Sequence, residues 1–316
     1  MAIAVSVVIP LFNREALVEE AVRSALAQLH PPAEIIVVDD GSTDRSAEVA
    51  ARLPVTLLRL KHNEGLSSAR NAGIRSAKGD VIAFLDSDDR WLPGHLSTIV
   101  DLLASHPDAG IAYTRMRSFG AASAEWRLTV PPETVRDCYW DLVESMIIPI
   151  PASAVRRRLI TERGAFDPSF RIAEDYEFFL RHARFSSIVC SNDITVEYRV
   201  HDAQLSSNAR NIILGTWRAR LVERNRLIHY GEPAELQRFD RIAQTALSVH
   251  NWTLVHNGDS LGLKMLHDQI RTETGGAITS ALLQGYRTLA VARNWSRHLP
   301  TPLRNVGRRL ATMLPH

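Results

Sequence analysis

The sequence contains two cysteines among its 316 residues, Cys138 and Cys190, and they form no Cys-x-x-Cys pair. Nothing therefore indicates a disulfide framework or a cysteine-based zinc site, and a reducing compartment is favoured. No apolar run reaches the length of about 20 residues that a membrane-spanning helix needs. The first residues lack the basic segment that begins a signal peptide. We therefore expect a cytoplasmic protein that is soluble or attached peripherally to the inner face of a membrane.

The sequence also lacks a strong charge of one sign. Its formal net charge is +2, so we expect no nucleic-acid partner. The charge is unevenly placed, because no acidic residue follows Glu273 while six arginines do. Residues 286–316 alternate arginine with apolar residues, as in basic amphipathic helices that lie on anionic membranes. The alternative, which we favour, is a helical region that packs on the rest of the chain or forms a homodimer.

The first hundred residues alternate short apolar runs with amphipathic segments. Repeated βα units of this kind predict an α/β fold with a doubly wound, mostly parallel sheet and helices on both faces. We expect strands at 5–9, ended by Pro10, at 34–38, at 55–60 and at 81–85, and helices at 15–29, at 42–52 with Ser42 or Thr43 as cap, and at 67–77.

The later part of the chain changes character after Ser206, where strand patterns stop and helical periodicity continues. We therefore expect an α/β domain at 1–205 and an all-helical region at 206–316, with breaks at 257–259 and 275–276. Before the boundary we expect helices at 93–106 and 174–184, strands at 110–113 and 188–200, and an irregular loop at 119–135. Two apolar stripes mark the helical region: Leu214, Trp217, Leu221 and Ile228, then Leu236, Phe239, Ala243 and Ala246.

The most informative segment is Phe84–Asp89, where the apolar run 81–85 ends in Asp86, Asp88 and Asp89. A short apolar run predicts a buried strand, and ligands in open α/β sheets bind beyond the carboxyl ends of strands. Clustered carboxylates suit a hard divalent cation. We predict a metal-dependent site for a diphosphate-bearing substrate here, against the simpler interpretation of an acidic loop that caps the next helix.

A second strand ends in Asp39 and Asp40. Carboxylates at such a position accept hydrogen bonds from ribose hydroxyls in dinucleotide folds. A Rossmann fold is not predicted, because residues 10–14 after the first strand contain no Gly-x-Gly-x-x-Gly. A turn followed by a helix cap is an equally good interpretation of these two residues.

Four other polar residues allow both a functional and a structural interpretation. Arg70 lies one turn into helix 67–77, where it can reach a phosphate or lie on the surface. Glu174 and Asp175 begin a helix, where they can act in catalysis or merely complement the helix dipole. His201 closes the last strand and can be a metal or phosphate ligand, or a structural histidine.

Taken together, seven segments follow one another as in the glycosyltransferase family 2 enzymes of GT-A fold, which the chain resembles over roughly residues 3–205. The segments are Val7–Asn13, Val37–Ser42, Asn63–Gly73, Phe84–Asp89, Gly164–Asp167, Glu174–Asp175 and Tyr198–His201. Two departures from the family pattern are small: Phe12 stands where tyrosine is frequent, and Asp89 extends the acidic cluster.

The resemblance implies a hexosyltransferase-type reaction in which a sugar moves, with inversion, from a nucleotide-diphosphate donor to a glycan or lipid-linked acceptor. A UDP-sugar is favoured as donor, and polysaccharide or cell-envelope biosynthesis as the setting. Asp175 would be the general base with Glu174 beside it, and Asp88 and His201 would ligate Mn²⁺ or Mg²⁺. The implied nucleotide-binding residues are Pro10, Phe12, Asn13, Asp39, Asp40, Arg70 and Asp86.

Two alternatives belong to other classes. A nucleotidyltransferase also uses a doubly wound sheet and a carboxylate-bound metal, but residues 10–14 are a poor match for its Gly-rich, basic loop. A non-catalytic scaffold that binds a nucleotide sugar would be expected to have lost a base or metal ligand, yet Asp88 and Asp175 are both present.

Overall fold

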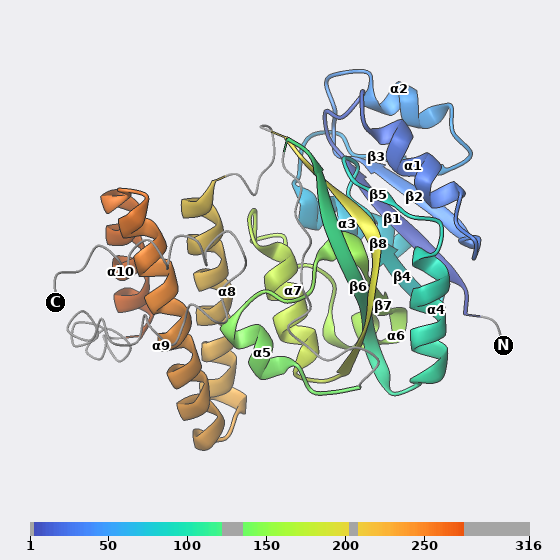
Figure 1. Ribbon diagram of the computed structural model, residues 1–316. Coiled ribbons are helices and arrows are strands. Elements are labelled where there is room, and N and C mark those ends of the chain that lie inside the picture. The colour runs from blue at the N-terminus through green and yellow to red at the C-terminus, as the bar shows by residue number, and fades with distance from the viewer. Residues whose placement is uncertain (1–2, 122–134, 202–207, 275–316) are drawn as a thin grey trace, which may run out of the picture.

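The computed structural model describes residues 3–121, 135–201 and 208–274. Within these residues an eight-stranded sheet has the order β3-β2-β1-β4-β7-β6-β8-β5 (Figure 1). The strands are β1 Val5–Leu11, β2 Glu34–Asp39, β3 Thr56–Arg59, β4 Val81–Phe84, β5 Arg90–Trp91, β6 Ala109–Gly120, β7 Ser153–Arg156 and β8 Ser187–Val200. The helices are α1 Val18–Leu26, α2 Ser46–Ala51, α3 Leu66–Ser76, α4 His95–Ser105, α5 Tyr139–Glu144, the 3₁₀ helix η1 Ile150–Ala152, α6 Arg157–Arg163, α7 Glu174–Ala183, α8 Ala209–Tyr230, α9 Pro233–His256 and α10 Ser260–Thr274.

Most of the sheet is parallel, as predicted. Strands β3, β2, β1 and β4 pair in parallel, and so do β6 and β8. Strand β7 is antiparallel to both β4 and β6, and the two-residue β5 is antiparallel to β8. The predictions missed β5, which has two residues, and β7, whose four residues Ser-Ala-Val-Arg form no continuous apolar run.

Strand β1 shows why the sheet is covered on both faces. All seven of its residues are buried. Val8 packs in a core with Ala69 of α3, whereas Val7 and Ile9 pack in a second core with α1 and α4. Successive side chains of a strand point to opposite faces, so β-branched residues at consecutive positions fill both layers.

Pro10 does not end the first strand, contrary to the prediction. It lies inside β1, paired with Val38 of β2. The backbone N–H of Leu85 donates to the carbonyl of Val8, so the backbone N–H and C=O groups of even-numbered residues in β1 point toward β4. The β1–β4 ladder ends at Val8, and the missing N–H of Pro10 therefore removes no sheet hydrogen bond.

Other predicted boundaries also move. Helix α2 begins at Ser46 with Arg45 as its N-cap residue, so the predicted cap at Ser42 or Thr43 is wrong. The predicted strand at 110–113 extends through Gly120 as β6, whose ten-residue register with β8 outweighs the weak pattern of its second half. Residues 122–134 of the predicted loop lie outside the described residues.

Helix α8 lies beside α7, α9 lies beside α5, and α10 packs against α8 and α9 on the side away from the sheet (Figure 1). Their apolar residues belong to the same core as α7, including Trp217, Leu221, Phe239 and Ala243. The stripe prediction fails at Ile228, which is 49% exposed while the neighbouring Leu227 is buried. The predicted break at 257–259 separates α9 from α10. The boundary at 205/206, the break at 275–276 and the segment 286–316 lie outside the described residues.

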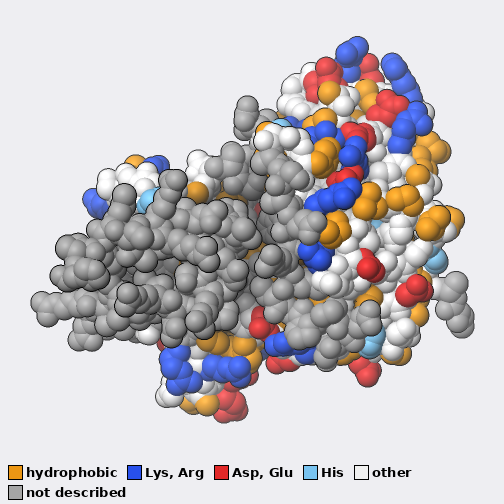
Figure 2. All heavy atoms as spheres, viewed as in Figure 1, with side chains coloured by type: hydrophobic (Ala, Val, Ile, Leu, Met, Phe, Trp, Pro, Cys, Tyr) orange, Lys and Arg blue, Asp and Glu red, His pale blue; other side chains and the backbone are white. Residues whose placement is uncertain are grey.

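None of the helices in the described residues combines the length and the apolar composition that crossing a bilayer requires. Cys138 and Cys190 are buried and form no disulfide in the described structure. On the face shown in Figure 2, acidic and basic side chains are interspersed near α1 and α2, in keeping with the small net charge.

Candidate active site

The acidic segments predicted to act together meet at one edge of the sheet. Strand β1 lies between β2 and β4 and is parallel to both. Asp39 and Asp40 stand at the carboxyl end of β2, and Asp86 follows β4. The carboxyl ends of parallel strands lie on the same side, so these carboxylates flank the loop that follows β1.

Asp40 is buried and fixes the segment before α3. Its two carboxylate oxygens accept hydrogen bonds from the backbone N–H groups of Glu64, at 2.7 Å, and Gly65, at 2.8 Å. Gly65 has φ +93°, a conformation that favours glycine. Burial, the largest influence, raises the pKa of Asp40. Asp40 thus stabilises the turn that begins the Arg70 helix.

Asp39 is fully buried and shapes its own turn. One oxygen accepts from the N–H of Ser42 at 3.1 Å, and the other lies 3.3 Å from Nε of Arg59. Gly41 between them has φ +72°. The turn part of the structural interpretation of the Asp39–Asp40 pair agrees with the structure, since both side chains hold turns. The helix-cap part is wrong, because the N-cap residue of α2 is Arg45 and no side chain caps that helix.

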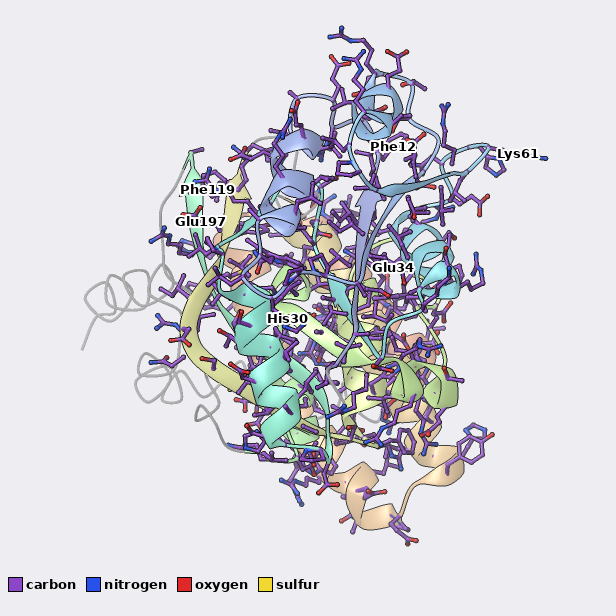
Figure 3. All side chains as sticks on the ribbon, turned by 90° about the vertical axis from the view of Figure 1, so that its right-hand side faces the viewer. Phe12, His30, Glu34, Lys61, Phe119 and Glu197 are labelled. Carbon is purple, nitrogen blue, oxygen red and sulfur yellow. The ribbon has the colours of Figure 1, made fainter. Side chains whose placement is uncertain are left out.

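The loop after β1 is hydrogen-bonded to the loop after β2. Asn13, in the left-handed region at φ 50°, accepts from the N–H of Thr43 at 2.9 Å, and its own N–H donates to Ser42 at 3.0 Å. Phe12 projects from this loop and is 39% exposed (Figure 3). Pro10 is buried inside β1, so of these three residues it is the one that cannot present its side chain at the surface.

Arg70 joins three predicted site segments. Its Nη1 donates to Glu174 at 2.6 Å and its Nη2 to Asp86 at 2.9 Å, although the side chain is only 1% exposed. The nearby carboxylates raise the pKa of Arg70 against the opposing effect of burial. The predicted surface alternative for Arg70 is wrong, because the guanidinium ties helix α7 to the acidic turn after β4.

Asp175 follows Glu174 at the start of α7. Glu174 is buried, whereas Asp175 is half-buried and accepts from the N–H of Tyr176 at 2.8 Å. Burial, and then the charge of Glu174, raise the pKa of Asp175 to about 7 against the effect of Arg70. A carboxyl group that titrates near neutral pH is suited to accept a proton in catalysis.

Asp88 and His201 come together, as predicted. Oδ2 of Asp88 lies 3.1 Å from Nε2 of His201 and 3.2 Å from Nε of Arg14. Arg199 reaches the same turn: its backbone N–H donates to Asp89 at 2.8 Å and its Nε to the carbonyl of Asp88 at 2.9 Å. The acidic turn is thus held by basic residues from two other parts of the chain.

Asp89 is buried to 1% exposure, and its Oδ2 has no partner in the described structure. Burial, and then the charges of Asp86 and Asp88, raise the pKa of Asp89 well above its usual value. The direction follows from the position, because burial and neighbouring negative charges both disfavour the charged form of a carboxyl group.

Sequence reasoning missed Arg14, Arg199 and Phe119. The ring of Phe119 lies between the guanidinium groups of Arg90, at 4.3 Å, and Arg199, at 4.5 Å. Figure 3 shows Phe119 and Glu197 together at the ends of β6 and β8, where Glu197 also pairs with Arg90. Arg14 directly follows the segment Val7–Asn13 and Arg199 lies within Tyr198–His201, so their position in the sequence was the available signal.

The fit to a divalent cation rests on two protein ligands. In the described residues no group of three or more His, Cys, Asp and Glu side chains could hold a metal ion. Asp88 and His201 do present an oxygen and a nitrogen 3.1 Å apart. Adjacent ligands about 2.1 Å from one Mg²⁺ in octahedral geometry are separated by about 3 Å. The two atoms are therefore spaced as adjacent ligands of one such ion would be.

Comparison with known sequences agrees with this geometry. The sequence model described as Glycosyl transferase family 2 matches residues 6–164. An uncharacterised glycosyltransferase of Rickettsia typhi is 30% identical over 218 residues, which cover 66% of this chain and 67% of that protein. TuaG of Bacillus subtilis, a glycosyltransferase named for teichuronic acid biosynthesis, is 28% identical over 222 residues, or 67% of this chain and 85% of TuaG.

Two solved structures share the fold. Residues 1–349 of TarS of S. aureus in complex with UDP-GlcNAc give a TM-score of 0.65 at 20% identity, covering 82% of this chain and 75% of that TarS chain. The mannosyltransferase PcManGT from Pyrobaculum calidifontis, in complex with GDP-Man and Mn²⁺, has a TM-score of 0.62 at 19% identity, covering 98% of this chain and 85% of PcManGT. These matches confirm the predicted GT-A fold.

The family match spans half of the chain and ends before Glu174, Asp175 and His201. Arg70 and Asp88 lie within it, and Arg70 connects the matched part to Glu174. The predicted transferase activity is confirmed by the family match and by relatives that are named glycosyltransferases. The chain is a glycosyltransferase and belongs to glycosyl transferase family 2.

Proposed function

We propose that this enzyme transfers a sugar from a nucleotide-diphosphate donor to an acceptor hydroxyl with inversion, in a single metal-assisted displacement. One observation carries the proposal: Arg70 bridges Glu174 at 2.6 Å and Asp86 at 2.9 Å. The bridge brings the start of α7, with its half-buried Asp175, to the acidic turn after β4. A proton acceptor and a diphosphate-binding turn therefore share one site, which single displacement requires.

The donor side of the site would be formed by the strand ends. Asp39, Asp40 and Asp86 would hold the nucleoside, and the exposed ring of Phe12 offers a surface on which a base can stack. Asn13 fixes the loop that carries Phe12 through its bond to Thr43. Arg70 would act through Asp86 and Glu174, because both ends of its guanidinium are engaged.

The diphosphate would lie at Asp88 and His201, which would hold Mn²⁺ or Mg²⁺. A divalent ion bound there neutralises charge that develops on the departing nucleoside diphosphate. Arg14 supplies a fixed positive charge beside the same carboxylate, 3.2 Å from Asp88. PcManGT, a structural neighbour, is in complex with Mn²⁺, and this supports a divalent ion without choosing between the two.

Asp175 would be the general base. A pKa of about 7 leaves a large share of its carboxylate ionised near neutral pH, and it can then accept the proton of the attacking hydroxyl. Proton transfer of this kind contributes about 10²–10⁴-fold in rate. An inverting displacement needs this one base and no covalent nucleophile on the protein.

We propose a UDP-sugar as donor and a glycan or lipid-linked acceptor. TarS, in complex with UDP-GlcNAc, supports the choice of UDP, although PcManGT is in complex with GDP-Man. The name of TuaG supports a role in polysaccharide or cell-envelope biosynthesis. The reaction would take place in the cytoplasm, with nucleotide sugars as substrates.

Calorimetric titration of UDP, GDP and dTDP, with and without Mn²⁺, tests the donor side. The wild type is compared with Asp88→Asn and with a control variant, Asp101→Asn, which makes the same charge change on an exposed residue of α4. We expect Mn²⁺-dependent binding of one nucleotide that Asp88→Asn weakens at least tenfold and the control leaves unchanged. Failure of the folded wild type to bind any of the three would contradict the proposal.

A further inference from the structure

The turn before Glu174 and Asp175 has an unfavourable backbone. Ala173 is the N-cap residue of α7 and lies in the left-handed region at φ 59°. A residue with a Cβ rarely adopts this conformation, and it persists only where neighbouring structure enforces it. No side chain caps this end of α7, so the enforcing contacts must come from elsewhere.

Helix α8 makes one such contact, at Gly215. A Cβ placed on Gly215 would lie 2.9 Å from the carbonyl oxygen of Ile172 and 3.1 Å from Cβ of Ala173. The helix can approach the turn this closely because Gly215 has no side chain.

Two arginines of α8 hold the segments on either side. Nη1 of Arg218 donates to the carbonyl of Ser169 at 2.6 Å, and its guanidinium lies 4.5 Å from the ring of Phe170. Arg220 is buried, and its guanidinium lies 4.8 Å from the ring of Tyr176. It donates to the backbone carbonyls of Val143 and Glu144, the last two residues of α5. The turn is therefore held before, at and after Ala173.

We propose that α8 positions the general base: Gly215 and Arg218 are positioning residues that fix the Ile172–Ala173 turn and thereby Glu174 and Asp175. The inference rests on the proposed function of Asp175. It gives the helical region a part in the chemical step as well as in the shared core. The carboxylates of Asp40 and Asp88, by contrast, are held by residues outside α8, namely Glu64, Gly65, Arg14 and His201.

Because α8 holds the turn before Asp175 while other residues hold Asp40 and Asp88, disrupting the contact between α8 and the Ile172–Ala173 turn should lower kcat and leave nucleotide binding unchanged. Displacing a catalytic group by about 1 Å can reduce a rate by about 10²-fold. We expect Gly215→Ala to lower kcat for nucleotide release from a UDP-sugar at least tenfold, with the Kd for UDP in the presence of Mn²⁺ within twofold of wild type.

The control variant is Gly262→Ala in α10. A Cβ at Gly262 would lie 2.4 Å from Oδ2 of Asp259, so the substitution makes the same change in the helical region but crowds the side chain of Asp259, and none of its nearest atoms belongs to the Ile172–Ala173 turn. We expect it to lower the thermal midpoint and to leave kcat of the folded protein within twofold.

If Gly215→Ala does not fold, Arg218 provides the test, because this residue is exposed. Arg218→Ala should lower kcat several-fold at constant Kd, and Arg218→Lys should restore most of it, since an ammonium group can also donate to Ser169. Unchanged kcat in Gly215→Ala and Arg218→Ala, or equal loss of kcat in the Gly262→Ala control, overturns the positioning proposal alone. A folded wild type without donor binding or turnover overturns the proposed function together with it.

Discussion

Arg70→Met tests whether the buried Arg70 bridge organises the site. Methionine retains much of the side-chain volume but removes the charge, which leaves Glu174 without its cation. Breaking a buried ion pair by removing one partner costs about 3–5 kcal/mol. The full cost applies to loss of the ion pair with Glu174, whose side chain is 7% exposed. Loss of the pair with Asp86 adds little, because the Asp86 side chain is 23% exposed and partly solvated. We therefore expect the free energy of unfolding to fall by about 3–5 kcal/mol.

The assay is urea unfolding at pH 7.5, with two comparison variants. Arg70→Met/Glu174→Gln removes the stranded charge as well and should recover at least half of the loss, since the cost lies mainly in the unpaired carboxylate. Arg23→Met breaks an exposed i,i+4 pair with Glu19 and should cost no more than about 1 kcal/mol. If Arg70→Met were no more destabilising than Arg23→Met, the Arg70 bridge would not stabilise the fold, and the role that we give it in organising the site would be refuted.

Two further predictions concern catalysis and backbone conformation. Because burial and Glu174 hold the pKa of Asp175 near 7, kcat for nucleotide release should fall as the pH drops below 7 and the base becomes protonated. The variant Asp175→Asn should lower kcat by about 10²–10⁴-fold and abolish this decrease at acidic pH. A wild-type kcat that stays constant from pH 5.5 to 8.5 would rule out Asp175 as the base. Gly41→Ala should destabilise the fold by about 1–3 kcal/mol, because Gly41 has φ +72° and its added Cβ would lie 2.6 Å from the carbonyl carbon of His62. The matched Gly94→Ala, which has nothing within 4 Å, should change the thermal midpoint little.

Local sequence patterns were sufficient for the first half of the sheet. Strands β1, β2 and β4 are runs of β-branched and apolar residues that end in turn residues, and they were predicted to within one or two positions at each end. Strand β5 has two residues, and β7 is as short as β4 but has the sequence Ser-Ala-Val-Arg in place of a continuous apolar run, so neither produced a strand signal. Their place in the sheet follows from pairing with β8, β4 and β6, which depends on contacts distant in sequence.

The same limit applies to the site. The sequence order of the motifs indicated which carboxylates matter, but not how they are held. Arg70 and Glu174 are 104 positions apart, and no local pattern links them. The sequence order also could not predict that both carboxylate oxygens of Asp40 accept hydrogen bonds from the backbone N–H groups of Glu64 and Gly65. Such partners are set by the close approach of α3, α7 and the strand ends after folding.

The most direct test of the central proposal is the stereochemistry of donor cleavage. The protein is incubated with UDP-GlcNAc or GDP-Man, both α-linked, in the presence of Mn²⁺, and the first sugar released is followed by ¹H NMR before it mutarotates. Inverting displacement with Asp175 as base predicts that the β-anomer appears first and that Asp175→Asn, which should still bind the nucleotide, releases almost none. First release of the α-anomer, or undiminished release by Asp175→Asn, would contradict the proposed mechanism.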